Sequence, residues 1–321
     1  MVDINAIPKV ELHCHLEGIV SPQMSDSIRQ HNPDFPLTAA SFEGYYPVNT
    51  LAEFSRWWHI VQPLYNGIRH FYPVLEQYIH VLKIQNVHYF EVMAKFAHHL
   101  PDDSAAAIEI MQAFRERLNT QENGDIQIEL MLMISRTDDV VIIEKSADMA
   151  ITLYQAGLIC GVSVAGLEVG YPVKSFTHIM QKLHDAGLKI EVHAGEWVGA
   201  ESVWDALEYG YPDRIGHGVN LFDDERLIEH VLEHNIHIEF CPISNLNTES
   251  VARIEDHPIK KALDMGMNFS ISTDDPGVFL NSLNDEFQLL VDTFGFTEAD
   301  FLKIYENSLA ARFVEEVRFK V

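Results

Sequence analysis

The chain has 321 residues, 47% of them hydrophobic, and its 48 acidic and 22 basic side chains give a formal net charge of −26. A charge of this sign repels polyanions, so we expect no nucleic acid partner and interpret the acidic surface as an aid to solubility. Residues 1–10 lack a signal-peptide core, no apolar run is long enough to span a bilayer, and three dispersed cysteines give no disulfide framework. We therefore expect a cytoplasmic protein with no membrane contact and no obligate protein partner.

Short runs rich in Val, Ile and Phe alternate with helical stretches along the chain. Helix-ending glycines, such as Gly187 and Gly266, come shortly before two of these runs. Eight strands that alternate with helices predict a (β/α)8 TIM barrel, of class α/β, formed by residues 1–321 as a single domain. The expected strands are 9–13, 87–93, 126–134, 158–166, 188–193, 214–217, 236–240 and 267–272.

Residues 21–80 are too many for one connection in such a barrel, so we predict a helical insertion after the first strand. Within it, Phe54, Trp57, Trp58 and Tyr65 recur at helical spacing. We expect this insertion to cover the active site as a lid, with Trp57 and Trp58 beside the substrate. Packing of these aromatic rings against the barrel wall is an equal alternative for either residue.

Polar residues gather where the predicted strands end, which is where barrel enzymes place their chemistry. His13 and His15 are two residues apart in a strand and therefore point to the same side. His193 ends the fifth strand and Asp274 follows the eighth, which neighbours the first in a closed barrel. Three imidazoles and one carboxylate suit a catalytic zinc ion, so we expect one Zn²⁺ per chain. For His193 alone, a buried histidine with satisfied hydrogen bonds is a better interpretation than a metal ligand. Only the occurrence of all four residues at strand ends favours metal ligation.

Proton transfer needs further groups at the same strand ends. A zinc ion lowers the pKa of a bound water to about 7, and His217 and Asp275 are the candidates that orient this water and accept its proton. Glu196 follows His193 closely and, if it is desolvated, is a candidate acid that protonates the substrate. The alternatives are a solvated loop carboxylate for Glu196 and a cap of the turn at Pro276 for Asp275.

The segments KVELHCHLEG, GVSVAGLEVGYP, EVHAGE, RIGHGV, CPISN and STDDP occur in this order from residue 9 to residue 276. In these motifs the chain resembles the adenosine deaminase family of purine aminohydrolases, within the amidohydrolase superfamily of metal-dependent barrels. The resemblance implies that hydroxide adds to C6 of an adenine ring and that ammonia leaves. It implies these roles: His13, His15, His193 and Asp274 hold one zinc ion, Glu196 protonates purine N1, His217 orients or deprotonates the water, Asp275 contacts that water and the N7 side, and the backbone of Gly166 contacts N3.

The sequence departs from the family pattern at positions near the substrate. Typical adenosine deaminases have aspartate where this chain has Glu17, and glutamate is found in members that act on adenine or 6-aminodeoxyfutalosine. The usual DLAG segment begins with Ser163 here, and residues 93–96 lack the arginine of many adenosine deaminases. We therefore expect Glu17 to lie near the group on N9, where this chain differs most from the usual pattern.

The first hypothesis is that the binding partner is a small purine substrate, adenosine or 2′-deoxyadenosine. The enzyme would convert it to inosine or 2′-deoxyinosine and release ammonia. The same reaction on adenine, an N6-substituted adenine or 6-aminodeoxyfutalosine is the alternative. A two-metal hydrolase of amide or phosphoester bonds is remote, because the fourth strand ends in Ala165-Gly166 without the bridging lysine of those relatives. A non-catalytic barrel would be expected to have lost a ligand or Glu196, and all are present.

Overall fold

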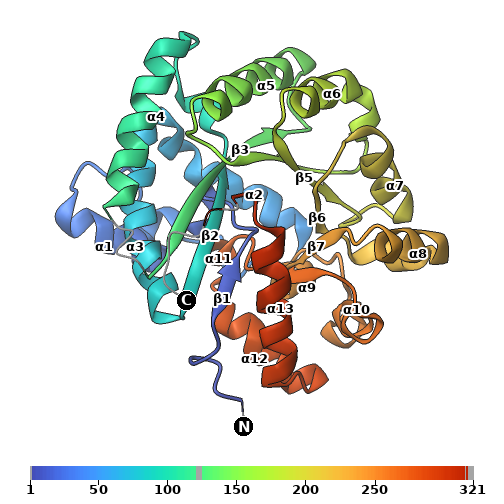
Figure 1. The fold of residues 1–321 in the computed structure, drawn as a ribbon. Helices are drawn as coiled ribbons and strands as arrows, with labels where there is room; N and C mark the ends of the chain where they lie inside the picture. The colour runs from blue at the N-terminus through green and yellow to red at the C-terminus, as the bar shows by residue number, and fades with distance from the viewer. Residues whose placement is uncertain (1, 121–124, 315, 317–321) are drawn as a thin grey trace.

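The computed structural model describes residues 2–120, 125–314 and 316, and in it eight parallel strands form one sheet in chain order. Helices surround the strands, so the predicted (β/α)8 barrel is confirmed (Figure 1). The strands are β1 (Lys9–Glu11), β2 (Val87–Ala94), β3 (Gln127–Ser135), β4 (Gly161–Ala165), β5 (Lys189–Ala194), β6 (Arg214–His217), β7 (His237–Phe240) and β8 (Phe269–Ile271). β1, β4, β7 and β8 are shorter than predicted, because the sequence pattern indicates which residues are extended and not which of them pair with a neighbouring strand.

The first and last strands meet at one short seam. Cys14 and Asp274 form an isolated parallel bridge. The His15 amide donates to the Asp274 carbonyl at 2.8 Å, and the Asp274 amide donates to the His13 carbonyl at 3.1 Å. The barrel is thus closed at the carboxyl ends of its strands by the segments in which three metal ligands are predicted.

The outer ring is built from amphipathic helices with polar caps. In α8 (Glu225–Glu233), the apolar residues Leu227, Ile228 and Val231 are buried, and the side chain of Asp224 accepts from the first turn of the helix. The other ring helices are α3 (Phe71–Ile84), α4 (Ser104–Asn119), α5 (Val140–Gln155), α6 (Thr177–Asp185), α7 (Ala200–Tyr209), α10 (Ile259–Met265), α12 (Leu283–Phe294) and α13 (Glu298–Ala311). Each such helix buries one apolar stripe against the barrel, which is the arrangement that period 3.6 predicts.

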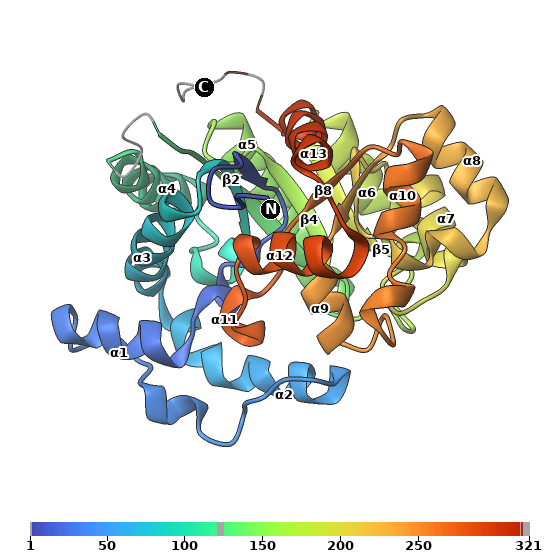
Figure 2. The same cartoon turned by 90° about the horizontal axis from the view of Figure 1, so that it is seen from below.

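Two further pairs of helices lie at the carboxyl ends of the strands. The short helices α9 (Pro242–Asn247) and α11 (Pro276–Phe279) directly follow β7 and β8. On the same side lie α1 (Pro22–His31) and α2 (Leu51–Val61), both from the segment that was predicted to be an insertion (Figure 2). The end of that segment enters α3, which packs against β2 as part of the ring.

Short 3-10 turns connect several of these elements, at Glu17–Ile19, Ala39–Phe42, Gln62–Asn66, Ile68–His70, Phe96–His99, Val173–Phe176, Val219–Asp223 and Ile254–Asp256. Among the helices of the described residues, we find none with the length and apolar character needed to cross a bilayer.

Candidate active site

A cavity of about 360 Å³ opens where the strands end. Its wall combines strand-end residues with the side chains of α2. Most of the predicted site residues line it, and so do several aromatic and aliphatic groups: His15, Leu51, Phe54, Trp58, Tyr65, Gly166, His193, Glu196, Trp197, His217, Asp274 and Asp275. The sequence therefore predicted the place of the cavity and much of its polar lining.

Two of these residues have unusual backbone conformations, which determine the direction of their side chains. His217 and Asp274 have φ angles of 61° and 63°, in the left-handed region that residues other than glycine rarely adopt. His217 is the last residue of β6, and Asp274 lies three residues after the end of β8. Outliers of this kind are held in place by their surroundings and cluster at functional sites.

The four predicted metal ligands lie near one another at the carboxyl ends of the strands. Asp274 Oδ1 lies 3.4 Å from His13 Nε2 and 3.3 Å from His15 Nε2. His15 Nε2 lies 3.2 Å from His193 Nε2. The His13 Nε2 and Asp274 Oδ1 atoms are buried without a hydrogen-bond partner, which is costly unless a cation lies between them. Three nitrogens and one oxygen are donors that zinc prefers, so these residues fit a divalent cation.

A second set of the same size overlaps with the first. Ligand atoms of His13, His193, His217 and Asp274 all lie within 4.8 Å of one another. His217 thus lies close to the proposed centre, where the sequence predicted a group that handles the water.

Acidic side chains support the ligands from behind. His13 Nδ1 hydrogen-bonds Glu239 Oε2 at 2.7 Å, so its Nε2 is free to face the centre. His193 Nδ1 lies 3.0 Å from Glu191 Oε1. Such carboxylates fix the orientation of a ligating imidazole and raise its basicity. Neither carboxylate is predicted from the sequence, although Glu191 lies two residues before His193 and so shares its side of β5.

An ion-pair network lies deeper in the barrel, below these carboxylates. The guanidinium of Arg214 is 2.5 Å from Glu91 Oε2 and 2.6 Å from Glu239 Oε1, and all three side chains are buried. The Phe313 ring stacks on the same guanidinium at 3.6 Å. Because Glu239 also hydrogen-bonds His13, this network links the barrel interior to the predicted ligands.

Glu196 has the environment of a proton donor. Its side chain is only 3% exposed. Burial, together with the charges of Asp274 and Glu168, raises the pKa of this carboxyl well above its usual value. A raised pKa favours the protonated carboxyl, and because the side chain is buried, the solvated alternative for Glu196 is wrong. Its Oε2 lies 3.6 Å from His217 Nε2.

His217 and Asp275 complete the polar wall of the cavity. Burial lowers the pKa of His217 well below its usual value, so its imidazole is neutral, and Asn245 Nδ2 lies 3.1 Å from its Nδ1. Asp275 is fully buried, and neither carboxyl oxygen has a hydrogen-bond partner. The capping alternative for Asp275 is wrong, because its side chain makes no cap hydrogen bond to α11.

Trp57, Trp58 and Glu17 occupy different environments. Trp58 lines the cavity, with its ring centroid 6.4 Å from that of His15. Trp57 is fully buried instead and packs on Phe42, because successive helix residues point about 100° apart. Glu17 is 1% exposed, and its Oε1 accepts from the Lys95 amide at 3.0 Å. Trp57 and Glu17 therefore lie behind the cavity wall, whereas they were predicted to contact the substrate.

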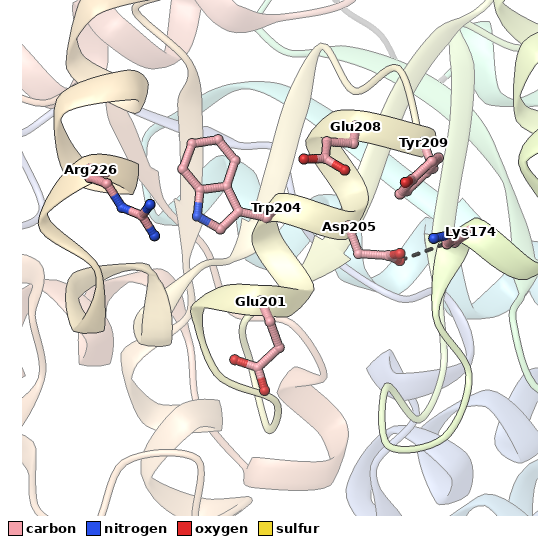
Figure 3. Close-up of a pocket in the computed structure, with 7 residues that line it drawn as sticks. All are labelled: Lys174, Glu201, Trp204, Asp205, Glu208, Tyr209 and Arg226. Carbon is pink, nitrogen blue, oxygen red and sulfur yellow. Dashed lines mark hydrogen bonds between the residues drawn. The ribbon is translucent and has the colours of Figure 1, made fainter.

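A second hollow, of about 580 Å³, lies on the outer face of α7 and contains none of the predicted residues (Figure 3). Several of its polar groups are already engaged: the Lys174 amide donates to Asp205 at 3.3 Å, and the Lys174 ammonium lies over the Tyr209 ring. Arg226 pairs with Asp224 at 3.0 Å. These contacts leave the hollow without the convergent, unpaired groups of the cavity at the strand ends.

Known proteins are similar to this chain in sequence and in fold. The family model described as adenosine deaminase matches residues 8–320. A protein of Shewanella loihica named adenosine deaminase is 34% identical over 194 residues, which are 60% of this chain and 57% of that protein. One of Pectobacterium atrosepticum with the same name is 36% identical over 192 residues, or 60% of this chain and 56% of its own. The chain spans little more than half the length of these curated relatives.

Solved structures with the same fold cover nearly the whole chain. An adenine deaminase from Arthrobacter aurescens superposes with a TM-score of 0.83 at 24% identity, over 96% of this chain and 94% of its own. An N6-mAMP deaminase from Arabidopsis superposes with a TM-score of 0.82 at 22% identity, over 98% and 95%. At these identities the similarity shows a common fold.

Proposed function

Because the chain belongs to the adenosine deaminase family, we propose that it hydrolyses the 6-amino group of an adenine-containing substrate and releases ammonia. One observation carries the proposal. Asp274 lines the same cavity as Glu196, and its buried Oδ1 lies 3.4 Å from His13 Nε2, with neither of these two atoms hydrogen-bonded. Burial raises the pKa of the Glu196 carboxyl, which favours its protonated form. A hydrolytic deamination needs both an activated water and an acid.

We propose that one zinc ion is held by His13, His15, His193 and Asp274. When bound, zinc supplies a water whose pKa is lowered to about 7. The outer carboxylates Glu239 and Glu191 hold the imidazoles of His13 and His193 in the tautomer that ligation needs.

The remaining roles fall to residues around the cavity. Glu196 donates its proton to purine N1, which draws electrons from C6 and makes that carbon more electrophilic. The neutral imidazole of His217 orients the water, and Asp275 contacts this water and the N7 side of the ring. The Gly166 backbone contacts N3. Trp58 gives the ring an aromatic wall, which favours a flat substrate.

We also propose that residues 21–80 form a lid within one domain of residues 1–321. The support is that Leu51, Phe54 and Trp58, all in α2, line the cavity. A lid excludes water from the reaction apart from the one that attacks.

Adenosine or 2′-deoxyadenosine is the first choice of substrate, in line with the relatives named adenosine deaminase. Adenine, an N6-substituted adenine or 6-aminodeoxyfutalosine is the alternative, which the glutamate at position 17 favours. The fold is shared with an adenine deaminase and an N6-mAMP deaminase and so agrees with either choice.

The test is to supply the protein with zinc and measure ammonia release from each substrate. Glu196→Gln keeps the shape of the side chain and removes its acidic proton, so kcat should fall about 10²–10⁴-fold. Glu208→Gln, an exposed position on α7, is the matched control and should retain the activity of the unmodified protein. Ammonia release from none of the substrates, or full activity in Glu196→Gln, would overturn the proposal.

A further inference from the structure

One carboxylate outside the cavity gathers an unusual number of donors. Glu168 follows β4 and is 3% exposed. Its two oxygens accept from four successive backbone amides and one hydroxyl: Gly195 N at 2.7 Å, Glu196 N at 2.9 Å, Trp197 N at 2.7 Å, Val198 N at 3.2 Å and Ser202 Oγ at 2.5 Å. These amides form the loop between β5 and α7, so the side chain of one loop organises the backbone of the next.

The carbonyl groups of that loop are held from the other side. Asn220, in the turn after β6, donates through Nδ2 to the Glu196 carbonyl at 2.9 Å and to the Val198 carbonyl at 3.3 Å. The backbone of residues 195–198 is therefore hydrogen-bonded from two sides. The Glu168 carboxylate accepts from its N–H groups, and the Asn220 side chain donates to two of its carbonyl groups. We call Glu168 and Asn220 together the loop clamp.

The loop needs these partners because it belongs to no strand or helix. Gly195 has a φ of 68°, and a Cβ there would lie 2.6 Å from Val203 Cγ2, so the chain turns tightly against α7. Buried amides without acceptors cost about 1–3 kcal/mol each. A charged acceptor makes stronger hydrogen bonds than a neutral one, which suits a carboxylate at this position.

We propose that the loop clamp is a positioning device: Glu168 and Asn220 fix the backbone of residues 195–198 so that the Glu196 carboxyl points into the cavity toward His217. The inference rests on the proposed function, in which Glu196 is the acid. Neither clamp residue touches the substrate in this scheme, and both act only through Glu196. A displacement of about 1 Å in a reacting group can cost about 10²-fold in rate.

Glu168→Gln tests the clamp. It replaces one accepting oxygen of the carboxylate with an NH₂ group, which would face the backbone N–H donors of residues 195–198. We expect kcat to fall about 10²-fold with a much smaller change in KM, and amide hydrogen exchange at residues 195–198 to accelerate. Asn220→Ala keeps the carboxylate and should give a smaller loss in kcat with faster exchange in the same loop. Glu208→Gln removes one charge from exposed α7 and should match the unmodified protein in both measurements.

A double-mutant cycle separates positioning from general damage to the fold. If Glu168 acts through Glu196, then adding Glu168→Gln to Glu196→Gln lowers kcat no further. An equal fold-loss in both backgrounds, or unchanged exchange at residues 195–198, overturns the inference. Should Glu168→Gln not fold, Asn220→Ala takes its place in the cycle, with the same two outcomes.

The two hypotheses fail in distinguishable ways. An unmodified protein that releases no ammonia contradicts the proposed function, while exchange at residues 195–198 still reports on the clamp. An active protein in which both clamp variants keep full kcat contradicts the positioning role alone.

Discussion

Replacing Gly216 with alanine tests the metal centre without removing any proposed ligand. Gly216 lies in β6, and a Cβ there would lie 2.3 Å from Glu191 Oε1, 2.9 Å from His13 Cε1 and 3.2 Å from His193 Nδ1. Ordinary contact begins at 3.4 Å, so the Glu191 carboxylate has to move by about 1 Å, and it lies directly behind His193. The substitution therefore disturbs the support of two ligands at once.

The loss of such support typically weakens metal binding 10–100-fold, or by about 1.4–2.7 kcal/mol. We expect a rise of this size in the zinc dissociation constant of Gly216→Ala, measured by competition with a chromophoric chelator. Gly161→Ala is the control: its Cβ would lie 2.6 Å from the Lys189 carbonyl, at the opposite end of the barrel. That variant should lose stability but keep its zinc affinity. Equal affinity in Gly216→Ala and the unmodified protein would refute the reasoning.

Burial lowers the pKa of His237 to about 3 in the folded protein. Between pH 6.5 and pH 3 this histidine is therefore protonated in the unfolded chain but not in the folded one. Stability is thus lost as pH falls, by about 2 kcal/mol from pH 7 to pH 5, and urea unfolding of His237→Gln should show a shallower loss. Arg214→Met leaves two buried carboxylates without their cation, which should cost about 3–5 kcal/mol in urea unfolding; an unchanged midpoint would contradict this. Gly18→Ala places a Cβ 1.7 Å from Asp275 Oδ1 and should lower kcat in steady-state assays, whereas full activity would exclude a role for that carboxylate.

The sequence predicted those parts of the molecule that depend on short-range pattern. Alternating strands and helices predict the barrel, and the barrel predicts that strand-end residues such as His13, His193 and Asp274 meet. The spacing of His13 and His15 even predicts that both point to one side. Each of these inferences uses only neighbours in the chain and the symmetry of the fold.

The parts that were missed depend on which distant side chains meet. Nothing near Glu168 in the sequence shows that its carboxylate gathers the amides of residues 195–198. The pair Trp57 and Trp58 illustrates another limit, because the helical pattern does not tell which of two adjacent rings faces the cavity. Strand ends were also misplaced by a few residues, since pairing is decided by the partner strand.

The seam between β1 and Asp274 has a consequence for the synthesis of this protein. His13 and His15 leave the ribosome early, while Asp274, which closes the barrel against them, is made only when most of the chain already exists. A chain that stops before Asp274 therefore lacks one of the four proposed ligands. His13 and His15 are therefore synthesised long before the residue that closes the barrel against them, and the seam can form only after translation has produced both ends of the barrel.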